Sequence, residues 1–134
     1  MKKITFAAVT VLALASANIA MPAPAPAAAT ANDDAMIALA THSGCMTCHS
    51  IKPVSPSDPG AKPVGPAWAD VAAKYKGKKG AAQKLTATVM QGSNPYASHW
   101  KGKVTGLAMP PNAVAIQRDD ARQLVRWILS LDAR

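Results

Sequence analysis

Two cysteines and a histidine stand within five consecutive residues of this 134-residue chain. Cys45 and Cys48 are separated by two residues, and His49 follows directly. On one turn of helix, two thiols at this spacing lie on the same side of the backbone, where they can form thioethers to the vinyl groups of a haem. The histidine then lies under the iron and can donate a ring nitrogen to it. The motif therefore predicts one covalently attached haem c, with His49 as an axial ligand.

Other kinds of site also use a Cys-x-x-Cys pair. A thioredoxin-like redox pair belongs to a βαβ unit, and no such pattern is visible in this chain. A zinc site needs two further ligands at metal spacing, which the remaining histidines, His42 and His99, do not supply. A disulfide between cysteines this close would be small and strained, and it would leave the adjacent histidine unexplained. The sequence favours haem attachment over all three.

A six-coordinate iron needs a second axial ligand from the opposite side of the haem. Met109 lies in a loop, and the two prolines that follow it stiffen the backbone and fix the direction of the thioether. His99 is its competitor, and bis-histidine ligation lowers the reduction potential relative to histidine and methionine. The other candidates lie inside the motif, in helical patterns where methionine fills a core, or too close to His49. They are Met36, Met46, Met90 and His42.

The first 31 residues predict export. A short basic start, Met1-Lys2-Lys3, precedes an apolar run over 4–20 and then small residues, as in a secretory signal peptide. The run is at the short edge of the roughly 20 apolar residues that span a bilayer, so we expect a cleaved signal rather than a retained anchor. The Pro/Ala-rich tract 21–29 is expected to be the tail of the signal peptide; if it survives processing, the alternative is an extended tether. The predicted location is the periplasm, with no stable membrane span after cleavage.

The remaining residues, 32–134, are enough for one domain. Hydrophobic spacing predicts helices and no confident strand, so the expected class is all-α with long loops. In the last helix, apolar residues at i, i+3, i+4 and i+7 form a buried stripe, namely Leu124, Trp127, Ile128 and Leu131. Clusters of proline and glycine predict loops over 52–66 and 92–112. The helices are expected at 35–43, 67–75, 80–91 and 118–131.

The charge of the chain predicts the kind of partner. Without Lys2 and Lys3, thirteen basic residues stand against seven aspartates, a net charge of about +6. The lysines are not interleaved with aromatic residues, so nucleic acid is not expected to bind. We expect an acidic protein surface, whose attraction speeds encounter and weakens as salt increases. A solvated surface without a partner is the alternative. The lysines concerned are Lys74, Lys76, Lys78, Lys79 and Lys84.

Four segments follow one another along the chain: Cys45–His49, Val64–Tyr75, Met109–Asn112 and Trp127–Ser130. In this order they resemble the small class I cytochromes c of bacteria, in particular the group that serves periplasmic nitrite reductases and related terminal enzymes. The resemblance covers nearly all of 35–131 and implies about four helices around one covalently bound haem. The stretches 50–64 and 95–107 are longer than in compact members, and the second brings Lys101 and Lys103 next to Trp100.

The resemblance also implies roles for individual residues. Cys45 and Cys48 bind the haem covalently, and His49 and Met109 are the axial ligands. Pro66 offers its carbonyl to the other ring nitrogen of His49, which fixes the tautomer and raises the basicity of the ligand.

Three more residues acquire roles from the same resemblance. Asn112 is expected to hydrogen-bond near the sulfur of Met109 and orient its lone pair. Trp100 is expected to reach a haem propionate with its indole N–H. Trp127 is expected to pack the last helix against the haem and the first helix.

The function that the resemblance implies is one-electron transport between respiratory or oxidoreductase partners, without enzymatic activity. We expect a monomer with a positive reduction potential. One alternative is a dedicated subunit bound permanently to an exported oxidoreductase, with the longer loops as interface. Another is a haem that loses its distal ligand and binds peroxide or a gas, against which the loop position of Met109 argues.

Overall fold

The computed structural model describes residues 26–53 and 62–131. Within these residues it contains four α-helices, two short 3₁₀ helices and no strand, so the predicted all-α class is confirmed. The α-helices are α1 (Pro26–His42), α2 (Trp68–Tyr75), α3 (Ala81–Gln91) and α4 (Arg118–Ser130). The 3₁₀ helices are η1 (Cys45–Thr47) and η2 (Pro95–Ala97).

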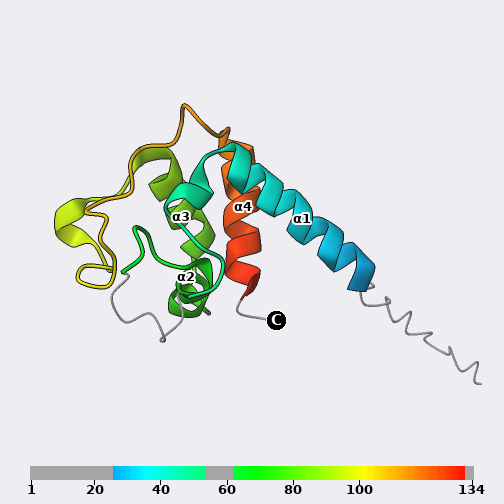
Figure 1. Cartoon of the computed structure of the whole chain (residues 1–134), viewed down its shortest axis with the longest axis horizontal. Coiled ribbons are helices and arrows are strands. Elements are labelled where there is room, and N and C mark those ends of the chain that lie inside the picture. Colours follow the sequence, from blue (N-terminus) through cyan, green and yellow to red (C-terminus); the bar gives the residue numbers. More distant parts are fainter. Residues whose placement is uncertain (1–25, 54–61, 132–134) are drawn as a thin grey trace, which may run out of the picture.

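Helix α4 is the element against which the other three helices pack. Its apolar stripe faces inward as predicted, because Leu124, Trp127 and Ile128 are buried and Leu131 packs partly buried beside them. In Figure 1, α4 stands between α1 on one side and α2 and α3 on the other. The core is small, so every large side chain of the stripe contributes a considerable part of it.

The boundaries of α3 follow from glycine. Gly80 precedes the helix with φ +72°, and Gly92 follows it with φ +82°. Both angles lie in the left-handed region that residues with a Cβ adopt only at a cost. The helix predicted over 80–91 is therefore confirmed, and the chain reverses direction sharply after Gln91 to enter the loop that carries Met109.

Helix α1 begins earlier than expected. The prediction placed the first helix near residue 35 and gave an extended tether as the alternative for the Pro/Ala-rich tract, but the helix starts at Pro26. The tether prediction is therefore wrong from Pro26 onward. Alanine has the highest helix propensity, and proline is well tolerated in the first turn of a helix, which explains the extension. In Figure 1, α1 projects beyond the other helices.

The predicted signal peptide lies mostly outside the described residues, as does part of the loop 52–66. Across 26–53 and 62–131, no helix is both long and apolar enough to cross a membrane.

We expect Leu124→Ala to lower the free energy of unfolding by about 2–5 kcal/mol, because Leu124 is 2% exposed and its removal leaves a cavity between α4 and its neighbours. Urea unfolding of the holoprotein, followed by circular dichroism, measures the change. Gln123→Ala, one position away on the exposed face of α4, is the control and should change stability by no more than about 0.5 kcal/mol. Equal effects of the two substitutions would contradict the packing described here.

Candidate haem-binding site

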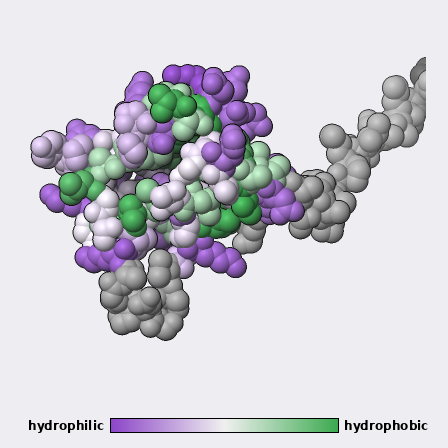
Figure 2. Space-filling view, turned by 45° about the horizontal axis from the view of Figure 1, so that its top comes forward, coloured by the Kyte–Doolittle hydropathy of each residue, from purple (hydrophilic) through white to green (hydrophobic). Residues whose placement is uncertain are grey.

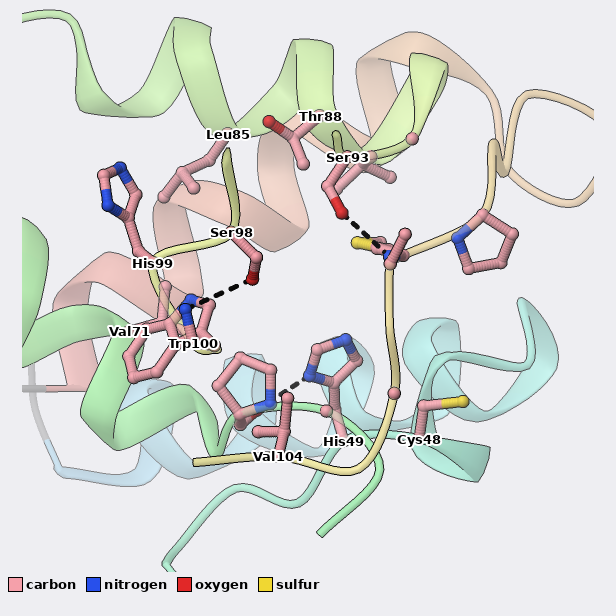
Figure 3. A pocket seen from close by; sticks show the side chains of 18 of the residues that line it. Cys48, His49, Val71, Leu85, Thr88, Ser93, Ser98, His99, Trp100 and Val104 are labelled. Carbon is pink, nitrogen blue, oxygen red and sulfur yellow. Dashed lines mark hydrogen bonds between the residues drawn. The ribbon is translucent and has the colours of Figure 1, made fainter. Parts of the chain in front are cut away.

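A cavity of about 500 Å³ opens between α2, α3, α4 and the loops that connect them. This volume lies within the range of roughly 300–1,000 Å³ for small-molecule and cofactor pockets. Cys48, His49 and Met109 line the same cavity, although Met109 is 60 residues away from the motif in sequence. Figure 3 shows His49 on one side and Leu85, Thr88 and Ser93 facing it from α3 and the residues after it. The fold thus brings the two predicted ligand segments together.

The imidazole of His49 is held in one tautomer. Its Nδ1 lies 2.7 Å from the carbonyl oxygen of Pro66, as the sequence analysis predicted. Because a carbonyl only accepts, Nδ1 must donate, and the lone pair of Nε2 is left for coordination. Burial lowers the pKa of His49, and the hydrogen bond to Pro66 offsets this in part. The neutral ring that a metal requires is therefore the favoured form.

Residues 65–68 are joined to the Cys45–His49 motif and to Ser50 by backbone hydrogen bonds. The N–H of Gly65 donates to the carbonyl of Cys48 at 2.7 Å, and the N–H of Trp68 donates to Ser50 at 2.8 Å. A Cβ at position 65 would lie 2.8 Å from Cε1 of His49, closer than real Cβ contacts allow. Glycine is thus required here so that Pro66 can approach the imidazole.

The two cysteines lie on the turn that precedes His49. The N–H groups of Cys48 and His49 both donate to the carbonyl of Cys45, at 3.3 and 3.1 Å, which produces the turn expected from the spacing. No disulfide joins Cys45 and Cys48, and Cys48 lines the cavity. Burial raises the pKa of the Cys45 thiol. A protonated, half-buried thiol is a poor nucleophile for redox chemistry, so the environment disfavours a thioredoxin-like role.

The backbone of Met109 is clamped to the end of α3. Its N–H donates to Oγ of Ser93 at 2.8 Å, and its carbonyl accepts from the N–H of Ser93 at 2.9 Å. Gly92 makes this approach possible, because a Cβ there would lie 2.9 Å from the carbonyl oxygen of Met109. In Figure 3, the Ser93 hydroxyl and the bond it accepts lie across the cavity from His49.

His99 and Trp100 also line the cavity. In Figure 3 they lie toward the end away from Ser93. The backbone N–H of Trp100 donates to Oγ of Ser98 at 3.2 Å, and the ammonium of Lys74 lies 5.5 Å from the centre of the indole. Such a cation–π contact fastens the long loop 95–107 to α2.

Two predicted site residues lie behind the lining of the cavity. The side-chain amide of Asn112 donates to the carbonyl of Pro110 at 2.7 Å, and its backbone N–H donates to Val89 in α3. Trp127 donates its indole N–H to Asp33 of α1 at 2.7 Å, so it links α4 to α1. The roles expected for both residues toward the haem stay predictions.

Sequence reasoning missed four residues that shape the site: Gly65, Trp68, Gly92 and Ser93. The sequence predicts a loop that begins at Gly92, but nothing in the sequence indicates that this glycine faces Met109. Gly65 and Trp68 lie in the segment Val64–Tyr75, which supports the family resemblance but gives neither residue a role of its own. Contacts between segments far apart in sequence decide all four roles.

Residues 37–132 match the family model for cytochrome c, and the chain belongs to this family. It is 43% identical over 97 residues to cytochrome c-551 of Allochromatium vinosum, covering 72% of this chain and 86% of that protein. It is 40% identical over 93 residues to cytochrome c-552 of Hydrogenobacter thermophilus, covering 69% and 78%. The crystal structure of Nitrosomonas europaea cytochrome c552 superposes with a TM-score of 0.54 at 37% identity, covering 71% of this chain and 98% of that one.

These comparisons place the chain among the small class I cytochromes c, and the family carries haem c bound through its cysteines. The residues present fit that group, since one cavity offers a thiol, a neutral imidazole with a free lone pair and a thioether.

We expect Gly92→Ala to destabilise the protein more than Gly77→Ala does. Both glycines have positive φ, so each substitution costs about 1–3 kcal/mol of backbone strain. Only at position 92 does the new Cβ also collide with the Met109 segment, which adds about 1–3 kcal/mol. Unfolding in urea gives the energies, and hydrogen exchange at the amide of Ser93 reports the local loosening. Equal losses of stability in the two variants would mean that the contact between Gly92, Ser93 and the backbone of Met109 does not constrain the Met109 loop.

Proposed function

We propose that this protein is an exported one-electron carrier with a single haem c, attached through Cys45 and Cys48 and ligated by His49 and Met109. The observation that carries the proposal is the convergence of His49 and Met109 on one apolar cavity from opposite sides of the fold. When bound, the haem supplies an iron that gains and loses one electron. The similarity to the proteins named cytochrome c-551 and cytochrome c-552 supports this proposal.

The chain's own residues keep the site rigid during electron transfer. Pro66 holds the His49 ring in one tautomer, and Ser93 holds the backbone of Met109. Because both ligand segments are fixed in advance, little rearrangement accompanies a change in charge. Thioether ligation and an apolar cavity both favour the state of lower charge, which gives a positive reduction potential. No substrate has to enter, and we propose no enzymatic activity.

We extend the proposal to a docking surface around the mouth of the cavity. Lys84 lines the cavity, Lys74 lies over Trp100, and Lys78 lies 5.4 Å from the ring centre of Tyr75, another lining residue. Three of the lysines singled out by the sequence thus surround the site. In Figure 2, hydrophilic side chains rim much of the visible face, and more apolar ones fill its middle. An acidic redox partner fits this arrangement, such as a periplasmic nitrite reductase or a related terminal enzyme.

A second candidate function is that of a subunit bound permanently to an exported oxidoreductase. The side chains of Leu107 and Val64 are 83% and 49% exposed, and both line the cavity mouth. A permanent interface would bury such side chains. Size-exclusion chromatography of untagged periplasmic extract separates the two functions, because a carrier elutes at the size of the monomer.

We expect Met109→Ala to abolish the weak sulfur-to-iron charge-transfer band of the ferric holoprotein in the far red, because the thioether is its source. His99→Ala is the control, since His99 lines the same cavity. It should leave the band and the low-spin spectrum intact. Loss of the low-spin spectrum in the His99 variant, with retention in the Met109 variant, would reverse the ligand assignment.

Electron-transfer rates with an acidic redox partner should fall steeply with ionic strength. The Debye length shrinks from about 8 Å at 0.15 M salt to about 3 Å at 1 M, which removes long-range attraction. Lys103→Glu should slow association more than dissociation, because Lys103 is exposed on the loop that carries Trp100.

Arg126→Glu provides the matched control for this experiment. It makes the same change of charge at an exposed position of α4, beside Asn32 and Met36 and away from the cavity mouth. Stopped-flow kinetics should show little effect of this variant. A rate indifferent to salt, or equal slowing by the two reversals, would argue against electrostatic docking at the cavity and for the permanent complex.

A further inference from the structure

Trp68, the first residue of α2, lies against the histidine of the motif. Its ring centre is 6.0 Å from that of His49, with 23° between the two planes. Trp68 is 4% exposed and lines the same cavity. The distance is within the range of about 4.5–7 Å at which aromatic rings interact favourably. The imidazole therefore has an indole stacked on it in addition to its hydrogen bond.

The two contacts restrict different motions of the ring. The bond from Nδ1 to Pro66, 2.7 Å long, fixes one point of the imidazole but leaves it able to rock about the line of that bond. A stacked ring of similar tilt opposes rocking out of the ring plane, because such a rotation moves one edge of the imidazole toward the indole. Pro66 and Trp68 are two residues apart on a segment fastened to Ser50 by the N–H of Trp68. One short segment thus controls both the tautomer and the tilt.

Trp68 also contacts a second aromatic ring, that of Trp127 in α4. The ring of Trp127 meets it edge-on, with 5.7 Å between centres and 84° between planes. The indole N–H of Trp127 donates to a carboxylate oxygen of Asp33 at 2.7 Å, and Trp127 is 5% exposed. A continuous line of contacts therefore runs from Asp33 in α1 through α4 and α2 to the motif histidine.

We propose that Trp68 is a positioning residue that sets the orientation of the His49 ring, and that Trp127 and Asp33 hold it in place. The inference rests on the proposed ligation by His49. A hydrogen bond from the far nitrogen raises the basicity of a ligating imidazole, which favours the ferric state. Loss of the stacked indole lets the ring rock and weakens its bond to Pro66. The reduction potential then rises.

The test compares variants of the holoprotein with the wild type. Trp68→Leu keeps an apolar side chain but removes the ring, Trp68→Phe keeps an aromatic face, and Leu124→Ala removes core volume away from the cavity lining. Paramagnetic NMR of the ferric protein reports the orientation of the axial histidine through the spread of the haem methyl shifts. Voltammetry gives the potential.

We expect Trp68→Leu to alter the order or spread of the methyl shifts and to raise the potential, with Trp68→Phe in between. Exchange of the His49 Nδ1 proton should quicken by up to about tenfold relative to the backbone amides of α4. Asp33→Ala should change the shifts in the same direction, more weakly. Leu124→Ala should lower stability without any of these effects.

Two results would overturn the proposal. Unchanged methyl shifts in Trp68→Leu, with a loss of stability like that of Leu124→Ala, would make Trp68 a core residue only. A lower potential would indicate entry of water that favours the ferric state, not release of the ring. Failure of His49 ligation is recognised separately, because the wild-type protein would then lack a low-spin spectrum. If Trp68→Leu does not assemble, the comparison of Trp68→Phe with wild type decides by the same readouts.

Discussion

The hydrogen bond from Nδ1 of His49 to the carbonyl of Pro66 is the constraint on which the rest of the site depends. It fixes the tautomer and leaves the lone pair of Nε2 for coordination, while burial lowers the pKa of His49 and favours the neutral ring. The approach needs a residue without a Cβ at position 65 and a backbone held to the motif by the bond from Gly65 to Cys48. The loop 62–66 is therefore part of the ligand geometry and not merely a connection between helices.

The opposite wall of the cavity is built in a similar way from different residues. Ser93 makes two hydrogen bonds to the backbone of Met109, and Gly92 permits the close approach. In both cases glycine permits a close backbone approach: at His49 the carbonyl of Pro66 accepts from the imidazole, and at Met109 the main chain itself is held by Ser93. Rigid placement before electron transfer keeps the rearrangement small, which is the physical requirement for a carrier of one electron.

Helix α4 lines the cavity and packs against the other three α-helices. Its stripe of Leu124, Trp127 and Ile128 closes the core, and Ile128 also lines the cavity. Because the core is small, the same side chains serve stability and the site together. The stacked line from His49 through Trp68 to Trp127 shows this most clearly, since it ends in a hydrogen bond to Asp33 on α1.

The sequence by itself determined the motif Cys45–His49, the all-α class, the four helices apart from the start of α1 at Pro26, and the buried stripe of α4, because local spacing and glycine positions decide them. It also indicated Met109, a loop methionine before two prolines, and the family resemblance implied the role of Pro66. Only the tertiary structure revealed the parts played by Gly65, Trp68, Gly92 and Ser93. The four site residues act through contacts with segments distant in sequence, and spacing along a chain carries no information about which distant segments approach to within 3 Å.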